Sequence, residues 1–455
     1  MRSLVRVVRP KPIDRDALER LLGEPPLAIE HIDAPSIVVD DRYHLAACRW
    51  LLRKQRLRPV DGTVLAHARR LALWIAYLRH ERGRDHPEPF AADVFAATED
   101  DMAAYYRARQ FNDETRVSSA TWRAQLSTIK QFHEYLRDTY GLALPFALSK
   151  FRTPAGTTVT SAHDLRPRTR TGSRGTPITP GFAELLIQGA LRIDADGRQS
   201  EARTVDRDAA FISLGLATGM RLETLANITT YEIPATTSQP FTSIRVPDFI
   251  TKGDAGGDAL VFSHRLTLVH HYLNADRAER VAEGQRWEPT NPIHLLQADE
   301  DGWSGMLGEE RISGRWAETT AHVRRRMVNP DGTTPVAWVD ARTGTPIVYH
   351  RSATITANAR NWTREHVHPD FPASFRTHDL RHTYATHLTV CIYKQAVTPH
   401  VHPDVADAYT PVRIADAVEI AKLSLGHASE ASTRLYLQQA PKLLHIDTDE
   451  FLGRN

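Results

Sequence analysis

Apolar residues recur at helical spacing in the first half of the chain. Between Thr63 and Glu81 the apolar positions fall three or four residues apart, which is the pattern of an amphipathic helix with one buried face. They are Leu65, Ala68, Leu71, Ile75 and Leu78. We therefore expect a helix here that packs into a core through these side chains.

Two further helices are expected between residues 98 and 141. Thr98 suits the N-cap of a helix whose first turn is acidic, and Gly141 is a stop signal for the longer helix after it. The apolar stripe of that longer helix consists of Trp122, Leu126, Ile129, Phe132, Leu136 and Tyr140. Its opposite face carries Arg123 and Lys130. A solvated surface is the simpler interpretation of these two side chains, and DNA contact is the alternative.

The second half of the chain mixes helical and extended patterns. The stretch "AAFISLGLATGM" predicts a helix that ends at a Thr-Gly turn, and "SATITANARNWTREHV" and "HDLRHTYATHL" predict two more. The runs "SIRVPDFITKG" and "ALVFSH" are rich in β-formers and flank "DAGGD", which indicates a hairpin. Residues 299–347 are rich in Gly and Asp with weak periodicity, so we expect an insertion with loops.

These patterns divide the chain into four parts and predict a mainly α fold with a small antiparallel β-sheet. Residues 1–35 are Pro-rich and form an N-terminal arm, and residues 36–150 form a helical block. Residues 151–176 are an interdomain linker rich in Gly, Pro, Ser and Thr, and residues 177–455 form a mixed α/β domain. The basic side chains of the linker include Arg166, Arg168 and Arg170. Such a linker suits a protein that wraps a polyanion, although most basic linkers are merely soluble.

Composition narrows the class of protein only a little. The chain has 455 residues and a formal net charge of +2, which favours two or three domains and neither requires nor excludes nucleic acid. Its two cysteines, Cys48 and Cys391, form no C-x-x-C pair, which argues against a disulfide scaffold and fits a reducing cytoplasm. We find no apolar run long enough for a membrane helix and no signal peptide.

The stretch "HDLRHTYATHL" allows two interpretations. His378 and His382 stand four apart, as in the zinc motif H-E-x-x-H. However, Asp379 replaces the glutamate, and neither a glycine nor a third histidine follows at the required spacing. We therefore expect no metal ligand here and a structural role for His382. The alternative pair is His378 with Arg381, three apart on one helix face and suited to a phosphate.

A phosphate site needs more than one cation and, for transfer, a nucleophile. Arg221 follows a Gly turn at the start of a predicted helix and could be the second arginine of a clamp on a phosphodiester. Lys252 lies at the tip of the predicted hairpin and could protonate a leaving oxygen. Tyr436, nine residues after His427, offers a phenol as nucleophile. Taken singly, each of these is more simply a surface or core residue.

Together and in this order, these residues resemble the catalytic set of the tyrosine recombinase (phage integrase) family. The set is Arg221, Lys252, His378, Arg381, His427 and Tyr436. "HDLRHTYATHL" and "LGHASEASTRLYL" carry the most specific match, and "TGMRLETL" and "TKG" carry a weaker one. The helical block is similar in layout to the family's SAM-like core-binding domain, so the resemblance extends over residues 38–440.

The resemblance implies a site-specific DNA recombinase or integrase that uses neither metal nor ATP nor another cofactor. Tyr436 would cut one strand of double-stranded DNA, leaving a 3′-phosphotyrosyl bond and a free 5′-hydroxyl. Arg221 and Arg381 would hold the scissile phosphate, and Lys252 would protonate the leaving 5′ oxygen. His378 would assist proton transfer at the tyrosine, and His427 would donate to a phosphate oxygen. Contacts to DNA are expected from Arg123, Lys130, Arg166, Arg168 and Arg170.

Three features depart from the family pattern. The family usually has an acid three residues after the first arginine, where this chain has Thr224; the adjacent Glu223 would point about 100° away on a helix. Insertions are expected near residues 299–347 and 393–412 of the catalytic domain. We expect these insertions to alter contacts with DNA or partners and to leave the chemistry unchanged.

The resemblance also implies a homo-tetramer on synapsed DNA sites and a monomer or dimer in free solution. The apolar tail after Tyr436 would then dock on a neighbouring protomer, and packing on its own domain is the alternative. Two other functions stay open: a type IB topoisomerase-like enzyme that relaxes DNA, and a DNA-binding accessory protein without catalysis. The DNA site and the biological role are not indicated by the sequence.

Overall fold

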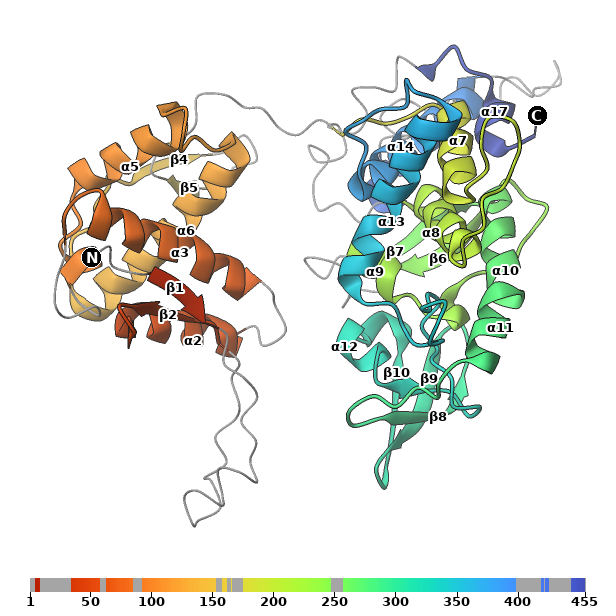
Figure 1. Cartoon of the computed structure of the whole chain (residues 1–455), viewed down its shortest axis with the longest axis horizontal. Coiled ribbons are helices and arrows are strands. Elements are labelled where there is room, and N and C mark those ends of the chain that lie inside the picture. Colours follow the sequence, from red (N-terminus) through yellow and green to blue (C-terminus); the bar gives the residue numbers. More distant parts are fainter. Residues whose placement is uncertain are drawn as a thin grey trace, which may run out of the picture. The chain divides into compact units, whose positions relative to one another are not determined.

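The structure is a computed structural model of the chain, and it forms two compact units, residues 1–173 and 174–455 (Figure 1). The described residues are 5–8, 34–57, 63–84, 92–152, 158–161, 165, 175–246, 257–397, 419–420, 422–424 and 443–454. The division between the units falls within the stretch 151–176, where the sequence suggests a linker. The described residues are mainly helical with small sheets, as the sequence predicts.

The first unit is built of helices with two small sheets. Its helices are α2 (Leu45–Leu57), α3 (Thr63–His80), α4 (Ala92–Phe95), α5 (Glu99–Phe111) and α6 (Ser119–Tyr140). Its strands are β1 (Val5–Val8), β2 (Ser36–Val39), β3 (Arg42–Tyr43), β4 (Ser149–Arg152) and β5 (Thr158–Ser161). All pairings within these two sheets are antiparallel.

The three predicted helices of this unit are confirmed, and local signals explain their limits. Thr98 caps α5 in a reciprocal capping box with Asp101, which satisfies backbone N–H groups that a helix start leaves open. Gly141 ends α6 in the left-handed conformation at φ 71°. The predicted stripe of α6 is buried except at its end, where Tyr140 is 39 % exposed. Tyr140 lies in the last turn, beyond the reach of the core.

One strand of this unit lies in the predicted N-terminal arm. Residues Val5–Val8 form β1, which pairs antiparallel with β2 so that Val5 faces Val39 and Val8 faces Ser36. Val5 and Val7 pack against the core of the helices. The sequence did not indicate this strand, because its partner lies about thirty residues downstream and local pattern does not report such pairings.

The second unit has more elements. Its helices are α7 (Pro180–Ala190), α8 (Val205–Thr218), α9 (Leu222–Asn227), α10 (Leu266–Asn274), α11 (Asp276–Glu283), α12 (Ala321–Arg324), α13 (Tyr349–Trp362), α14 (Thr377–Val397) and α17 (Thr448–Leu452), with short turns η2 (Thr230–Glu232), η3 (Ser263–Arg265), η4 (Trp316–Glu318) and η5 (Thr363–Val367). Its strands are β6 (Phe241–Val246), β7 (Gly257–Phe262), β8 (Ile293–Ala298), β9 (Gly302–Leu307), β10 (Glu310–Arg315) and β11 (Met327–Val328).

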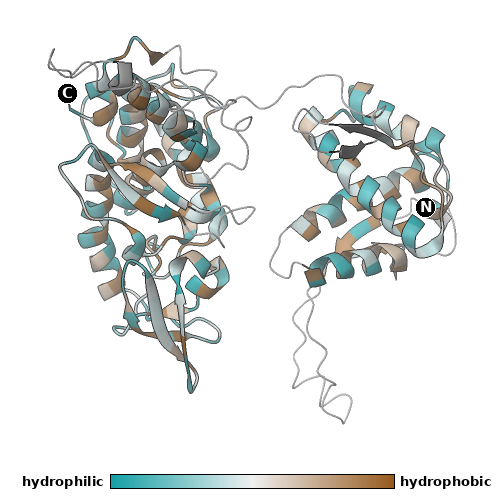
Figure 2. Cartoon of the chain, turned by 180° about the vertical axis from the view of Figure 1, so that it is seen from behind, coloured by the Kyte–Doolittle hydropathy of each residue, from teal (hydrophilic) through white to brown (hydrophobic). Residues whose placement is uncertain are grey.

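Helix α8 lies at the centre of this unit. Every residue from Arg207 to Thr218 is buried, and α8 contacts α7, α10, α13 and α14. A helix that is apolar all round must be covered on all sides, which the surrounding helices provide. Figure 2 shows that hydrophobic and hydrophilic residues alternate around the outer helices of both units. The predicted hairpin is confirmed as β6 and β7, in which Phe241 faces Phe262.

Residues 299–347 contain loops, as expected, and also strands that the sequence did not indicate. Strands β8, β9 and β10 form an antiparallel meander there, and β11 pairs parallel with β8. This inserted sheet has a small core around Ile293, Leu295, Trp316 and Met327. The chain enters and leaves this sheet at neighbouring positions: before β8 the Trp287 N–H donates to the carbonyl of Gly332, after β11, at 3.0 Å. The strands escaped prediction because glycines interrupt the alternation of apolar residues in "GWSGML" and "ERISGR".

The described part of the tail, residues 443–454, packs on its own unit, which is the alternative that the sequence leaves open; docking on a neighbouring protomer stays a prediction. Leu443, Ile446, Phe451 and Leu452 are buried against residues of α14. The Phe451 ring lies edge-on to His387, with centroids 5.0 Å apart. Burying these side chains within one chain removes their apolar surface from water without a partner. Among the described helices, none combines the length and the apolar character needed to cross a membrane.

Candidate functional site

Helix α14 carries two of the predicted site residues, His378 and Arg381. Most of this helix is inside the protein, because every residue from Asp379 to Cys391 is buried. Many of these residues are polar, and buried polar groups need hydrogen-bond partners. The hydroxyls of Thr383, Thr386 and Thr389 donate to carbonyls four residues earlier in the same helix. Other polar groups bond to the backbone of distant segments, and through these contacts α14 fixes several parts of the unit relative to one another.

Arg381 links α14 to the end of α8. Its Nη1 donates to the Gly219 carbonyl at 2.7 Å, and the side chain is 4 % exposed. Gly219 has a φ of 61°, and a side chain there would collide with the Tyr384 ring, which lies 2.2 Å from the Cβ position. Only glycine combines this backbone conformation with this close approach. The turn after α8 is therefore seated on α14 by Arg381 and Tyr384.

Arg221 follows this turn by two residues and begins α9. It occupies the N-cap position with extended backbone, and its carbonyl accepts the Leu225 N–H at 2.9 Å. The side chain is half-buried. The position of the turn that Arg381 holds therefore determines the position of Arg221. Two arginines that are 160 residues apart in sequence thus lie in the same part of the fold.

The electrostatics of His378 place it with these two arginines. Desolvation lowers the pKa of His378 most, and the positive charges of Arg381 and Arg221 lower it further against the opposing effect of Asp379. Charges act in this way only at close range. The lowered pKa favours the neutral form of His378 at pH 7, which can accept a proton, and the charges of Arg221 and Arg381 act on this ring.

The geometry around His382 favours a structural role. The His378 and His382 rings lie edge to face with centroids 4.9 Å apart, and burial lowers the pKa of His382 to about 4, with contributions from His378 and Arg381. A Cβ on Gly175 would lie 1.9 Å from the His382 ring. Within the described part of the chain, no three His, Cys, Asp or Glu side chains are grouped as metal ligands.

Three residues of α14, four apart, hold the segment 175–179. Asp379 accepts the Thr176 N–H at 3.2 Å, and Thr383 accepts the Ile178 N–H at 3.2 Å. The His387 ring contacts the Ile178 carbonyl at 2.8 Å. Asp379 also accepts the Arg376 N–H at 2.8 Å. Asp379 is thus engaged in the backbone contacts of its own helix start and of the segment that leads into α7.

Glu223 and Thr224 differ in their surroundings. Thr224 is buried at 1 % exposure, whereas Glu223 is exposed. The negative charge of Glu223 adds to burial in raising the pKa of Tyr349, so its carboxylate lies towards α13. Whether Glu223 replaces the acid that the family usually has near the first arginine stays a prediction.

Several predicted residues fall outside the described parts of the chain. These are Lys252, His427, Tyr436, Arg166, Arg168 and Arg170, together with most of the insertion expected at 393–412. Arg123 and Lys130 lie in the first unit, on α6. The Arg123 Nε donates to the Ser119 carbonyl at 3.2 Å, and Lys130 lies 3.8 Å from Glu134. The catalytic roles of Lys252, His427 and Tyr436 stay predictions, and so does DNA binding by Arg123, Lys130 and the three linker arginines.

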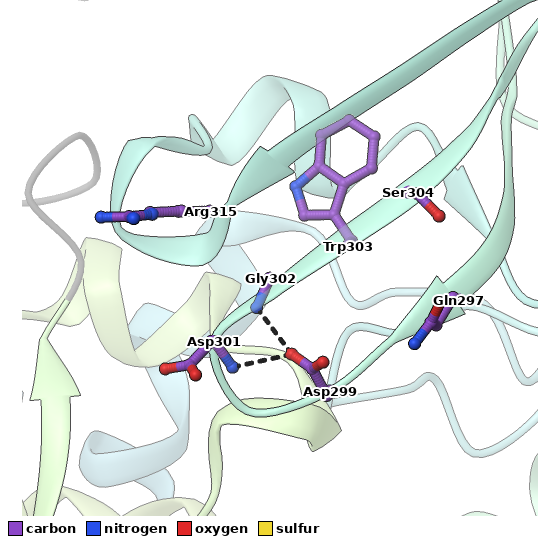
Figure 3. A pocket seen from close by; sticks show the side chains of 7 residues that line it. All are labelled: Gln297, Asp299, Asp301, Gly302, Trp303, Ser304 and Arg315. Carbon is purple, nitrogen blue, oxygen red and sulfur yellow. Dashed lines mark hydrogen bonds between the residues drawn. The ribbon is translucent and has the colours of Figure 1, made fainter.

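Two cavities lie on the inserted sheet. One, of about 300 Å³, is lined by Gln297, Asp299, Asp301, Gly302, Trp303, Ser304 and Arg315 (Figure 3). In it, Asp299 accepts the backbone N–H groups of Asp301 and Gly302, so its carboxylate serves the β8–β9 turn. The other, of about 690 Å³, lies between this sheet and the β6–β7 hairpin. Arg221, His378 and Arg381 line neither cavity.

Comparisons with known proteins give structural matches and no match in sequence. No family model and no curated protein matches the chain. The XerH site-specific recombinase bound to its difH substrate is 12 % identical, with 84 % of this chain and 79 % of that chain covered and a TM-score of 0.45. A lambda integrase dimer bound to a COC′ core site is 11 % identical, with 86 % and 94 % covered and a TM-score of 0.43.

A third match is to a transposon protein. The Tn1549 transposon integrase in complex with transposon right end DNA is 11 % identical, with 87 % of this chain and 97 % of that chain covered and a TM-score of 0.45. These identities and TM-scores are too low to assign a function. The chain is thus similar to solved recombinases and integrases, and what it does must be inferred from its own residues.

Proposed function

We propose that the chain is a tyrosine-type site-specific DNA recombinase that cuts and rejoins DNA through a 3′-phosphotyrosyl intermediate. The observation that supports the proposal is that Arg381, on the same helix as His378, donates to the Gly219 carbonyl in the turn just before Arg221. Two arginines from distant segments, held at one place by a buried helix, are costly to assemble without an anion to bind. The nucleophile, Tyr436, and the general acid, Lys252, are assigned from the order of the six residues along the chain.

The chemistry follows from the charge that develops at phosphorus. As the Tyr436 oxygen attacks, the non-bridging oxygens gain negative charge, and Arg221 and Arg381 stabilise it with charge-assisted hydrogen bonds. His378 accepts the phenol proton, which its low pKa allows at neutral pH. Lys252 gives a proton to the leaving 5′ oxygen. The ester stores the bond energy, so the 5′-hydroxyl of a second strand reverses the step without ATP or metal.

Binding would involve both units. The helical first unit, with Arg123 and Lys130 on α6, and the basic stretch with Arg166, Arg168 and Arg170 would contact the DNA backbone, where positive charge releases counterions. The active form would be a homo-tetramer on two synapsed duplexes, acting in the cytoplasm. The inserted sheet and the residues near 393–412 are additions to this plan.

A covalent trap tests the proposal. A duplex is first selected from a randomised pool by binding to the full chain, and it is then nicked beside the cleavage position so that the cut strand diffuses away. We expect a protein–DNA adduct with the parent in the presence of EDTA and no adduct with Tyr436→Phe. No adduct from the parent, or an equal adduct from Tyr436→Phe, would contradict the proposal, and equal DNA binding in that case would indicate an accessory protein.

A second assay separates recombination from relaxation. Two labelled duplexes that carry the selected site are mixed with the protein, and supercoiled plasmid is assayed in parallel. We expect exchanged strands between the duplexes. Relaxation of the plasmid without exchange would instead identify a type IB topoisomerase-like enzyme, which shares this cleavage chemistry.

A further inference from the structure

The helix that begins at Arg221 is very short. Helix α9 has six residues, Leu222–Asn227, so a shift at its end reaches Arg221 within two turns. The last carbonyls of any helix have no partner within the helix and must be satisfied by other groups. The groups that satisfy them in α9 therefore also determine where Arg221 is held.

The groups that satisfy the end of α9 come from the end of α12, which lies between β10 and β11, and from the chain that follows β11. The Trp338 Nε1 donates to the Leu225 carbonyl at 2.5 Å. Arg325 donates from Nε to Asn227 Oδ1 at 2.7 Å and from Nη2 to the Ala226 carbonyl at 3.5 Å. Arg324 Nη1 reaches the Asn227 carbonyl at 3.4 Å. Cationic donors at a helix C-terminus also interact favourably with the helix dipole.

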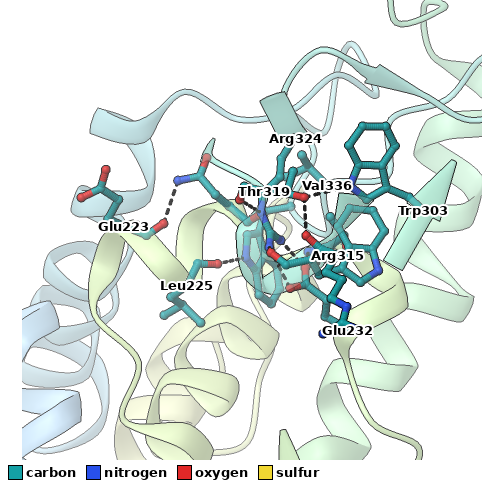
Figure 4. A network of polar contacts seen from close by, with 12 residues as sticks. Glu223, Leu225, Glu232, Trp303, Arg315, Thr319, Arg324 and Val336 are labelled. Atoms are coloured by element: carbon teal, nitrogen blue, oxygen red, sulfur yellow. Dashed lines mark hydrogen bonds and ion pairs between the residues drawn. The ribbon is translucent and has the colours of Figure 1, made fainter. Parts of the chain in front are cut away.

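Arg324 is itself fixed. Its side chain is fully buried and pairs with both carboxylate oxygens of Glu232, and it donates to the carbonyls of Trp316 and Thr319 (Figure 4). Glu232 in turn accepts the N–H and the hydroxyl of Thr229, two residues after α9. A buried charge pair that is fully hydrogen-bonded is rigid, because breaking it leaves a charge without compensation.

Arg325 is the direct connection between the insertion and α9. A third contact, from its Nη1 to the Ile347 carbonyl at 2.8 Å, ties it to the chain just before α13. Its planar guanidinium therefore engages three acceptors in fixed directions, which an ammonium group cannot do. At its other end, α9 follows the Gly219 turn that Arg381 holds. Arg221 is thus placed between a turn fixed by α14 and a helix end fixed by the insertion.

We infer that Arg325 is a positioning residue for Arg221, so that the inserted sheet supports catalysis in addition to enlarging the surface. This inference rests on the proposed function. It revises the expectation that the insertion leaves the chemistry unchanged. In this chain, which has Thr224 where the family usually has an acid, the insertion holds Arg221 through the helix that it begins.

The test compares Arg325→Ala with Arg277→Ala. Arg277 is a matched control, because it is buried and donates to three carbonyls, those of Thr334, Val336 and Ala337, none of them in α9. Single-turnover adduct formation is measured on the nicked duplex, with DNA affinity measured separately. We expect Arg325→Ala to slow adduct formation about 10- to 100-fold with unchanged affinity, and Arg277→Ala to keep the parental rate below its own unfolding temperature.

A double variant separates positioning from general damage. If Arg325 acts through Arg221, Arg325→Ala should change the rate little in an Arg221→Lys background, because the geometry it protects is already lost. Arg325→Lys should restore only part of the rate, since it keeps the charge without the fork. Equal slowing by Arg325→Ala in both backgrounds, or a parental rate in Arg325→Ala, would overturn the inference.

A measurement without DNA keeps the inference distinct from the proposed function. Hydrogen exchange at the Leu225 amide, which bonds to the Arg221 carbonyl, should rise in Arg325→Ala and not in Arg277→Ala. Unchanged exchange at this amide overturns the inference even if DNA is cut. A parent that forms no adduct, together with raised exchange in Arg325→Ala, contradicts the proposed function while the role of Arg325 in holding α9 stands.

Discussion

Helices α6 and α14 are nearly equal in length, with 22 and 21 residues, but they are held in different ways. Helix α6 buries one stripe of apolar side chains and leaves its other side to solvent. Helix α14 is buried on all sides over residues 379–391, although many of these residues are polar. A one-sided helix is held by its apolar contacts, whereas α14 is held by hydrogen bonds that also fix other segments.

The difference shows which kind of helix can carry a site. The polar residues of α14 reach the backbone at Ile178, Gly219 and Leu260, the last through the Tyr384 hydroxyl at 2.6 Å. Each contact fixes a distant segment relative to His378 and Arg381. Precise placement of charged groups requires such support, because small displacements greatly weaken catalysis. Helix α6 carries no proposed catalytic residue; its apolar stripe is supplemented by a few polar contacts, such as that of the Trp74 Nε1 with His133 Nε2 at 3.0 Å.

The largest effect is expected from a cavity in α6. Phe132 is fully buried between Trp50 and Tyr135, so Phe132→Ala should lower the free energy of unfolding of the first unit by about 3–5 kcal/mol. Urea unfolding followed by hydrogen exchange in α3 and α6 measures this loss. Tyr140→Ala, at the exposed end of the same stripe, is the control and should lose far less; equal losses would mean that the stripe is not what holds α6.

The second effect concerns two arginines, one in each helix, which should affect different quantities: the rate of DNA cleavage for α14 and the strength of DNA binding for α6. Arg381→Ala should slow adduct formation about 100- to 1000-fold, as expected for the loss of a group that stabilises developing charge. Arg123→Ala in α6 should leave the cleavage rate of bound DNA unchanged and reduce the salt dependence of binding by about one unit in slope. Rate measurements at saturating protein and binding at several salt concentrations give both values. A slower cleavage rate in Arg123→Ala, with a parental rate in Arg381→Ala, would contradict the comparison.

The third effect is a difference in sensitivity to acid. Burial lowers the pKa of His387 to about 3, and burial with nearby positive charge lowers that of His382 to about 4, both in α14. In α6, burial lowers the pKa of His133 to about 3. These rings stay neutral in the fold, but the unfolded chain binds protons below about pH 6.5, so stability is full above that pH and falls as the pH drops towards 4.

At pH 5 each of these histidines should lower the free energy of unfolding by at most about 2 kcal/mol. Helix α14, in which the pKa of His378 is lowered as well, should therefore lose more protection than α6 between pH 7 and pH 5. Hydrogen exchange of the two helices, corrected for the intrinsic pH dependence of exchange, measures the difference. His387→Gln should narrow it, and equal losses in the parent would show that these rings do not set the acid response.

The smallest effect tests one hydroxyl in each helix. Thr383→Val leaves the buried Ile178 N–H without its acceptor, which should lower stability by about 1–3 kcal/mol. Thr128→Val in α6 removes a buried hydroxyl that pairs at 2.9 Å with the His67 ring. Because His67 is only partly buried, its ring nitrogen can bond to water instead, so the effect should be smaller. Thermal unfolding of both variants measures the order. A larger loss in Thr128→Val would show that α14 does not depend on its polar contacts.

The two helices also mark what sequence reasoning can reach. Helix α6 was predictable in position, buried face and end, because its stripe and Gly141 are local signals. Helix α14 has no such stripe and was found through the spacing of His378 and Arg381. The contact of Arg381 with Gly219 was not predictable, because no local signal connects residues 162 positions apart.

The inserted sheet is the part of the molecule that local sequence pattern predicted least well. Its strands are short and interrupted by glycines, so pattern alone suggested loops. Its role in holding α9 depends on Arg324 and Arg325, which belong to a run of three arginines that reads as surface charge in the sequence. Only the fold shows that Arg324 is fully buried and that Arg325 meets the end of α9.

The meeting of Trp287 with Gly332 at the base of the inserted sheet has a consequence for how this protein can change. A segment whose ends are neighbours can be gained or lost as one module, in a single event in the coding sequence, without rerouting the surrounding chain. Trp338 lies outside that module and would keep its contact with Leu225. Arg324 and Arg325 lie inside it, so an exchanged module is compatible with this chain only if it brings donors that fit the same end of α9.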